Sequence, residues 1–232
     1  MTIAKNTNST EKLNLASYIE HTLLKPEATT SQIELLCEDA LKHSFKGVCV
    51  NSSYVSLAAS KLKGSATLVV SVIGFPLGCG LSEAKAFEAE LAAKNGAQEI
   101  DMVLHIGAVK EGRWSFIEQD IQMVTQAVGI PVKVILETGF LKTEEIKRAC
   151  QVSEAAGALF VKTCTGFAPG VATVDHIQLM RASVSQKLGV KASGGIKTYE
   201  QAIDLIKAGA TRLGTSSGVQ LGTYQSVPTH SY

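Results

Sequence analysis

The chain has 232 residues, 45% of them hydrophobic, and its 22 lysines and arginines against 21 aspartates and glutamates give a formal net charge of +1. This length suits a single α/β barrel domain with a sizeable core. The near-zero charge argues against a surface built for nucleic acid or an anionic membrane, so an anionic ligand would need a local site.

The cysteines indicate a reducing compartment. They are scattered, odd in number and without CxxC spacing: Cys37, Cys49, Cys79, Cys150 and Cys164. Neither a metal cluster nor a disulfide framework fits this pattern. The first ten residues are polar and unlike a signal peptide, and no stretch approaches the roughly 20 apolar residues of a membrane span. We therefore expect a soluble, cytoplasmic protein with no metal and no cofactor.

Short apolar runs alternate with helical patterns along the whole chain. The runs that predict strands cover residues 18–22, 47–51, 67–73, 99–104, 132–136, 159–163, 190–192 and 212–215. Helical periodicity is clearest at 31–43, 83–94, 143–156 and 199–207, and Thr143 followed by two glutamates is typical of a helix start. Strands that alternate with helices predict parallel βαβ units.

A repeated Gly-Ala step supports this organisation. It follows a predicted helix and precedes a predicted strand at 96–97, 157–158 and 209–210. Glycine just beyond a helix adopts the left-handed cap at low cost. When the three segments are aligned on these glycines, the residues five positions later are Asp101, Lys162 and Gly214. Asp101 and Lys162 therefore fall at equivalent positions of the fourth and sixth strands.

Eight predicted strands favour closure into a single (β/α)8 TIM barrel, whose interior is filled from alternate strands. A doubly wound open sheet is the alternative, but no GxGxxG follows the first strand. We expect the barrel to span residues 11–221, with tails at 1–10 and 222–232.

Four charged residues interrupt or end otherwise apolar strands: Asp101, Glu137, Lys162 and Lys191. Each alone reads as a strand-end residue that reaches solvent, but four at comparable strand ends indicate a site.

A lysine becomes a nucleophile only after it loses its proton, and a second ammonium group nearby favours that loss. Lys191, on the next strand, is placed to act in this way on Lys162. Asp101 is placed to carry protons, directly or through a water. Lys162 is the better nucleophile because it shares the alignment with Asp101 and precedes a polar loop, whereas Lys191 precedes Ser193-Gly194-Gly195.

Two glycine-containing loops follow the seventh and eighth strands, at 192–195 and 214–218. Glycine lets backbone N–H groups approach an anion closely, and barrels often bind phosphate with these two loops. Each loop alone is more often a simple turn. The ordered pair predicts a phosphate site, and with the lysines it predicts a small phosphorylated sugar as substrate.

Several ordered motifs closely resemble the deoxyribose-phosphate aldolase family, over residues 18–218. They are Glu-His-Thr-Leu-Leu-Lys-Pro at 20–26, Gly-Phe-Pro-Leu-Gly at 74–78, Glu-Ile-Asp-Met-Val at 99–103, Lys-Val-Ile-Leu-Glu-Thr-Gly at 133–139, Val-Lys-Thr at 161–163, Lys-Ala-Ser-Gly-Gly at 191–195 and Gly-Thr-Ser-Ser at 214–217.

The resemblance implies a metal-independent lyase that forms a Schiff base and interconverts 2-deoxy-D-ribose 5-phosphate with glyceraldehyde 3-phosphate and acetaldehyde, in deoxyribose phosphate catabolism. It implies the Schiff base on Lys162, proton handling by Asp101 and a pKa-lowering amine at Lys191. It implies substrate or phosphate contacts at Glu20, Thr22, Thr165, Gly166, Gly194, Gly195, Ser216 and Ser217.

The chain departs from the family pattern at several positions. Glu20 stands where aspartate is usual, so a substrate hydroxyl or a water is expected to be held differently. Cys164 replaces a serine, and Val171 follows Gly170 where a second glycine is common, which would stiffen that loop. In some relatives a C-terminal tyrosine assists proton transfer, a role open to Tyr232, although terminal residues are often frayed.

Two other functions remain open at this stage. Another phosphosugar barrel, either an isomerase or a different Schiff-base aldolase, would share the phosphate loops. A non-catalytic sugar-phosphate sensor would keep the phosphate site and lack a reactive amine, which the set of Asp101, Lys162 and Lys191 argues against. A homodimer is an open expectation, with neither nucleic acid nor membrane as a partner.

Overall fold

The structure is a computed structural model that describes residues 13–223. Its eight strands are parallel and hydrogen-bonded in sequence order, and β8 pairs with β1 to close the barrel. The strands are β1 (Ile19–Leu23), β2 (Gly47–Asn51), β3 (Leu68–Ile73), β4 (Glu99–Val103), β5 (Val132–Ile135), β6 (Phe160–Lys162), β7 (Gly189–Ser193) and β8 (Arg212–Thr215). The predicted TIM barrel is confirmed, and the alternative of an open sheet is wrong.

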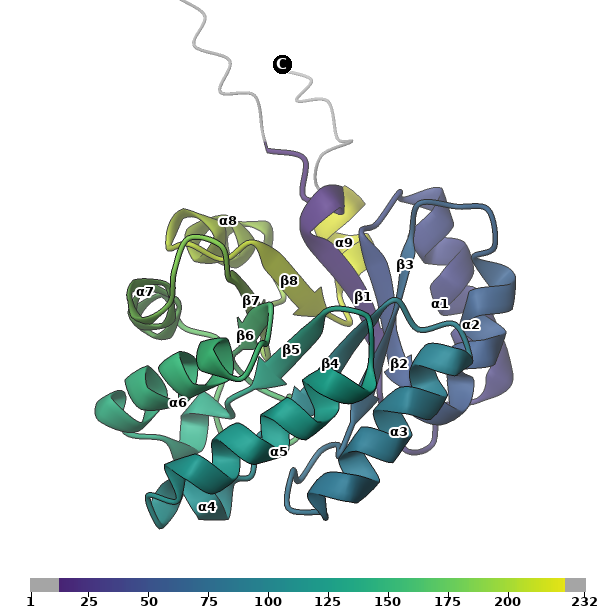
Figure 1. Cartoon of the computed structure of the whole chain (residues 1–232). Helices are drawn as coiled ribbons and strands as arrows, with labels where there is room; N and C mark the ends of the chain where they lie inside the picture. Colours follow the sequence, from purple (N-terminus) through teal and green to yellow (C-terminus); the bar gives the residue numbers. More distant parts are fainter. Residues whose placement is uncertain (1–12, 224–232) are drawn as a thin grey trace, which may run out of the picture.

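Helices surround the barrel (Figure 1). They are α1 (Thr30–Lys42), α2 (Val55–Lys61), α3 (Ser82–Lys94), α4 (Ile106–Lys110), α5 (Trp114–Ala127), α6 (Thr143–Ala155), α7 (Val174–Ser183), α8 (Tyr199–Lys207) and α9 (Gly218–Thr223). The predicted strands and helices all form, with ends that differ by a residue or two. The domain limits of 11 and 221 stay a prediction, because most of the two predicted tails lies outside the described residues.

Local sequence accounts for the helix ends. Gly96, Gly157 and Gly209 have φ angles of 109°, 87° and 116°, which confirms the left-handed caps expected from the Gly-Ala repeat. Helix α6 begins at Thr143 as predicted, with Glu144 and Glu145 in its first turn near the positive end of the helix dipole. These caps direct each chain segment back into the barrel.

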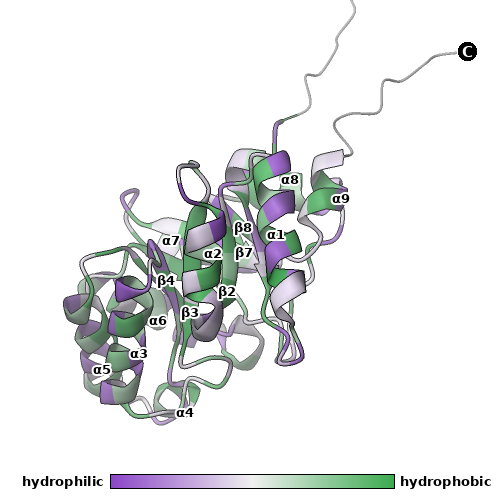
Figure 2. Ribbon diagram, turned by 90° about the vertical axis from the view of Figure 1, so that its right-hand side faces the viewer, coloured by the Kyte–Doolittle hydropathy of each residue, from purple (hydrophilic) through white to green (hydrophobic). Residues whose placement is uncertain are grey.

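The barrel separates two apolar clusters. The larger lies between strands and helices and takes alternate strand residues such as Val48 and Val50. The smaller cluster takes strand residues from the other set of alternate positions, such as Cys49, and so lies inside the barrel. Its members are Leu24, Cys49, Val70 and Val72, with Phe75 packed against them. Figure 2 shows β2 and β3 as mainly hydrophobic, whereas the surface helices also carry hydrophilic residues. No helix within residues 13–223 is both long and apolar enough to cross a membrane.

Candidate active site

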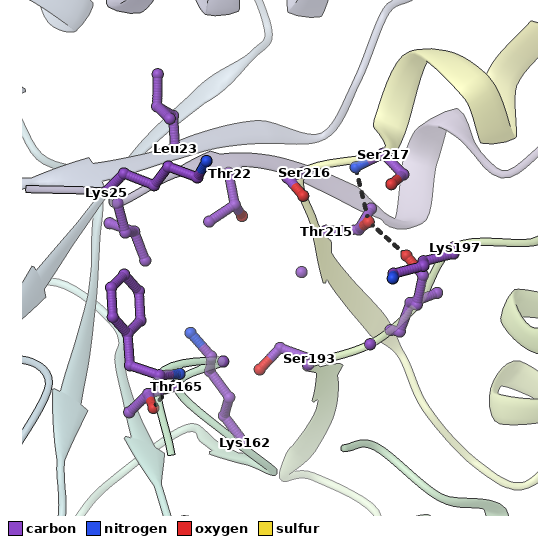
Figure 3. Close-up of a pocket in the computed structure, with 17 residues that line it drawn as sticks. Thr22, Leu23, Lys25, Lys162, Thr165, Ser193, Lys197, Thr215, Ser216 and Ser217 are labelled. Carbon is purple, nitrogen blue, oxygen red and sulfur yellow. Dashed lines mark hydrogen bonds between the residues drawn. The ribbon is translucent and has the colours of Figure 1, made fainter. Parts of the chain in front are cut away.

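A cavity of about 340 Å³ opens beside the carboxyl ends of β1, β6, β7 and β8, where barrels of this type place their active sites (Figure 3). Its walls are made by residues 22–25, Lys162, 165–167, 193–197 and 214–217. The volume is in the range that small-molecule sites occupy. The predicted phosphate residues of both glycine loops therefore share one cavity with Lys162.

Lys162 ends β6 and its side chain points into this cavity (Figure 3). Only 2% of the residue is exposed, and its Nζ donates a 2.8 Å hydrogen bond to Oδ2 of Asp101 on β4. The structure thus brings together the two residues that the glycine alignment placed at equivalent positions.

Lys191, on β7, contacts the same carboxylate. Its Nζ donates to Asp101 Oδ2 at 2.7 Å and also to the Glu20 carboxylate. Burial lowers the pKa of Lys191, but the carboxylates of Asp101 and Glu20 outweigh that effect and raise the pKa above its usual value. Lys191 therefore stays charged at neutral pH.

Asp101 is fully buried. Burial by itself raises its pKa, but Lys133, Lys162 and Lys191 outweigh burial and hold the pKa well below its ordinary value of 3.8. In this state Asp101 is a carboxylate that can accept a proton and has none to give.

A deeper layer of charge lies below these groups. Lys133 Nζ lies 2.6 Å from Glu99, 2.9 Å from Asp101 and 3.5 Å from Glu20. Arg212 lies 2.6 Å from Glu20 and 3.0 Å from Glu99. Lys133, Glu99 and Arg212 were not predicted from the sequence as members of this site. The available signal was Lys133 itself, a charged residue between two valines in a short strand.

Glu20 lies among the buried charges inside the barrel. It was expected to hold a substrate hydroxyl or a water, yet it is fully buried and does not line the cavity. Burial raises its pKa, but Lys133 and Lys191 outweigh burial, so the net pKa is below the ordinary 4.5. Its carboxylate joins Lys191 to Arg212, so its role here is to pair charges inside the barrel.

Glu137 acts on the loop after β6. It has a left-handed backbone with φ of 57°, and its carboxylate accepts hydrogen bonds from the backbone N–H of Thr165, at 3.2 Å to Oε2, and from the Thr165 hydroxyl. This pairing holds Thr165 and the adjacent Gly166 in the cavity wall. Glu137 is therefore a positioning residue in this arrangement.

The two glycine loops are tied together. Thr215 Oγ1 donates to the carbonyl of Ile196 at 2.8 Å and accepts from the backbone N–H of Ser217 at 2.9 Å (Figure 3). Gly194 and Gly195 have φ angles of 97° and 76°, which favour glycine.

Val171 packs against this turn. A Cβ at Gly195 would lie 2.6 Å from Val171 Cγ1. Val171, one of the positions that depart from the family pattern, therefore fills the space beside Gly195. Only glycine fits at position 195 without a shift of Val171.

The cavity wall carries two lysines that the sequence analysis did not single out as site residues. Lys25 and Lys197 lie on opposite sides of the cavity, and both are exposed (Figure 3). With Lys162 they bring three lysines to the wall, and no aspartate or glutamate lines it among the described residues. The cavity is suited to an anion. Tyr232, expected as a candidate proton relay, lies outside the described residues.

Three buried groups approach a metal-binding geometry. One ligand atom each of Glu20, Cys49 and Asp101 lie within 4.8 Å of one another. Both carboxylates are already bonded to Lys191, and burial raises the pKa of the Cys49 thiol to about 11. A divalent cation would have to enter beside an ammonium group, so this chemistry does not suit a metal.

Comparisons with known proteins identify the family of this chain. The model of the DeoC/LacD family aldolases matches residues 15–223. A deoxyribose-phosphate aldolase of Streptococcus gordonii is 55% identical over 210 residues, 90% of this chain and 96% of that protein, and one of Bdellovibrio bacteriovorus is 54% identical over the same shares. The tetrameric deoxyribose phosphate aldolase of Aeropyrum pernix is 31% identical with a TM-score of 0.83 over 91% of both chains. The chain belongs to the DeoC/LacD family of aldolases.

Proposed function

We propose that this protein is a metal-independent lyase that reversibly cleaves 2-deoxy-D-ribose 5-phosphate into D-glyceraldehyde 3-phosphate and acetaldehyde. Relatives more than half identical carry the name of this activity. The observation that carries the proposal is Lys162, whose amine faces a cavity of small-molecule size and contacts a buried carboxylate that a second lysine shares.

The chemistry begins with the amine of Lys162. The neutral amine adds to the C1 aldehyde of the open-chain sugar, and the carbinolamine takes up a proton from solvent and loses water to form an iminium. The C3 hydroxyl then loses its proton, and the C2–C3 bond breaks with its electron pair drawn into the iminium. Glyceraldehyde 3-phosphate departs, the enamine is protonated at C2, and hydrolysis releases acetaldehyde and the free lysine.

Asp101 and Lys191 support these steps in different ways. Asp101 is ionised, so it accepts a proton through a water molecule as the C3 hydroxyl is deprotonated. Lys191 keeps its positive charge beside the same carboxylate, which favours the neutral form of Lys162.

The phosphate is held where the two glycine loops meet. We assign its contacts to Gly166, Gly194, Gly195, Ser216 and Ser217, with Thr22 and Thr165 as further substrate contacts in the same cavity wall. The positive charges of Lys25 and Lys197 support this assignment, because a phosphate ester carries negative charge that neutral loops do not balance.

Reductive trapping tests the proposal. The protein is incubated with acetaldehyde or deoxyribose 5-phosphate and borohydride, and the modified peptide is identified by mass spectrometry. We expect one reduced adduct on Lys162 and none in Lys162→Met, with Lys187→Met, an exposed lysine outside the cavity, as the matched control. An adduct on Lys191 in the unmodified protein would exchange the roles of the lysines. No adduct on folded protein would refute Schiff-base chemistry.

We also propose that the protein acts in the cytoplasm as a homodimer, with residues 11–221 as its catalytic domain. Free cysteines support a reducing compartment.

A dimer interface is supported by three exposed apolar side chains on α3 and the loop before it. They are Leu77, Leu81 and Phe87, which are 73%, 74% and 62% exposed. Light scattering should give a dimer mass, and Phe87→Glu should give the monomer. A monomer in the unmodified protein would refute the dimer.

A further inference from the structure

Seven charged side chains form one connected group inside the barrel, which we call the barrel charge cluster. Every member is at most 7% exposed, and each contacts at least one other at 3.5 Å or less. The cluster runs from the cavity floor to the opposite end of the barrel. Its members are Glu20, Glu99, Asp101, Lys133, Lys162, Lys191 and Arg212.

The cluster holds three carboxylates and four cationic groups, so its net charge is +1 when all seven are ionised. An uncompensated charge inside a barrel is costly because no water solvates it. The loss of one proton from one lysine would make the cluster neutral.

The contacts indicate which proton is lost. Arg212 does not deprotonate in proteins. Lys133 contacts three carboxylates and Lys191 contacts two, whereas Lys162 contacts Asp101 alone and is the member that lines the cavity. Lys162 therefore has the fewest carboxylate contacts of the three lysines and is the one that reaches the cavity.

We propose that Glu99 and Arg212, at the far end of the cluster, set the protonation state of Lys162 through the net charge of the cluster. This inference rests on the proposed function, which needs Lys162 as a neutral amine. Both are positioning residues, because they form ion pairs with Glu20, Lys133 and one another and do not line the cavity. The control that Lys191 exerts on Lys162 thus extends to groups that never meet the substrate.

The side chain of Phe160 packs beside Arg212 at the far end of the cluster. The Arg212 guanidinium lies 5.2 Å from the centre of the Phe160 ring, and a Cβ at Gly189 would lie 2.1 Å from that ring. Phe160 therefore occupies space that only glycine leaves free, beside Arg212. This packing limits the access of water to the far end of the cluster. The charges there are therefore screened less by solvent and act over a longer distance.

Two other titratable groups, Cys49 and Glu137, make no ion pair with the cluster among the described residues. Cys49 on β2 is a neutral thiol, since burial raises its pKa to about 11. Glu137, after β5, is bonded to Thr165 on the loop that follows Lys162. The charged groups on β1, β4, β5, β7 and β8 inside the barrel are members of the cluster, and on the cavity side Lys25 and Lys197 line the same wall as Lys162.

Substitutions that remove a positive or a negative charge from the cluster should shift the pH at which Lys162 deprotonates in opposite directions. Arg212→Gln removes one positive charge, so Lys162 can keep its proton in a neutral cluster and should deprotonate at higher pH. Glu99→Gln removes one negative charge, so Lys162 should deprotonate at lower pH. The double variant restores the net charge and should return close to the unmodified protein. A purely structural role predicts no such pair of opposite shifts.

The measurement is the rate of iminium formation with acetaldehyde and cyanoborohydride as a function of pH, with Lys162 modification read by mass spectrometry. We expect the midpoint to move up in Arg212→Gln and down in Glu99→Gln, each by about half a pH unit or more. Arg212→Lys keeps the charge and should leave the midpoint within about 0.2 units of the unmodified protein.

Folding of each variant is checked by circular dichroism. Where a single variant does not fold, Lys133→Met replaces Arg212→Gln and Glu20→Gln replaces Glu99→Gln, with the same expected signs. Shifts in one direction only, or no shift while Lys162 is still trapped, would overturn the inference and leave the proposed function intact. No trapping at any pH in the unmodified protein would overturn both.

Discussion

Lys197 follows the first glycine loop directly and lines the cavity, so its charge lies beside the expected phosphate. We predict that Lys197→Met raises KM for deoxyribose 5-phosphate about tenfold or more, the loss of one charge-assisted hydrogen bond, with a smaller effect on kcat. Activity on non-phosphorylated deoxyribose should not change. Lys187→Met, an exposed lysine outside the cavity, is the control. Equal losses on both sugars would contradict a phosphate contact.

Gly214 leaves space for Lys191. A Cβ there would lie 3.0 Å from Lys191 Cε and 3.1 Å from Ser193 Cβ, so both side chains would have to move. We predict that Gly214→Ala lowers kcat by about tenfold to a hundredfold, because a small displacement of a catalytic group is costly. Gly129→Ala adds a methyl group with nothing within 4 Å and serves as the control. Unchanged kcat in Gly214→Ala would show that Lys191 tolerates the shift.

At the scale of elements, α3 and α5 are joined by a buried ion pair. Lys85 Nζ lies 2.6 Å from Asp120 Oδ2 and 3.2 Å from the carbonyl of Val103, and Ser82 donates to Asp120 Oδ1 at 2.7 Å. The two helices therefore dock on β4 through charge as well as apolar packing.

Breaking this pair on one side should be costly, because it leaves Asp120 buried without its cation. We predict that Lys85→Met lowers the free energy of unfolding by about 3–5 kcal/mol, and that Lys85→Met with Asp120→Leu recovers most of the loss. Urea denaturation measures both. Lys147→Met, in an exposed pair with Glu144, should cost about 1 kcal/mol or less. A double variant as unstable as the single one would contradict this account.

At the scale of the whole molecule, the barrel charge cluster links stability to pH. The pKa values of Asp101 and Glu20 lie below their ordinary values of 3.8 and 4.5 in the folded protein, because the lysines favour the ionised forms. Their stabilisation is fully present above the unfolded pKa values and is lost as pH falls through the folded ones.

We therefore predict that Tm changes little down to about pH 5 and falls steeply below about pH 4. Calorimetry from pH 3 to pH 7 measures this. Asp101→Asn should flatten the fall, whereas Glu90→Gln, on the exposed face of α3, should follow the unmodified protein. An equally steep fall in Asp101→Asn would show that other carboxylates control acid unfolding.

The sequence by itself determined the local elements and the class of fold. Hydrophobic periodicity and the Gly-Ala caps depend on residues a few positions apart, so strand and helix limits could be read within a residue or two. The alignment on Gly96 and Gly157 also placed Asp101 and Lys162 at equivalent positions of two alternate strands, β4 and β6, and the structure joins their side chains. The ordered motifs predicted the family, which the comparisons confirmed.

Only the tertiary structure decided the partners of each buried charge. Glu20 and Arg212 are 192 positions apart and meet because β8 pairs with β1 when the barrel closes. No local pattern records that contact, so Glu20 was interpreted as a substrate contact while Glu99, Lys133 and Arg212 were left out of the site. Local sequence sets which way a strand residue points. Closure and stagger of the barrel set which other charges that residue contacts. In our proposal those contacts control the protonation state of the Lys162 amine.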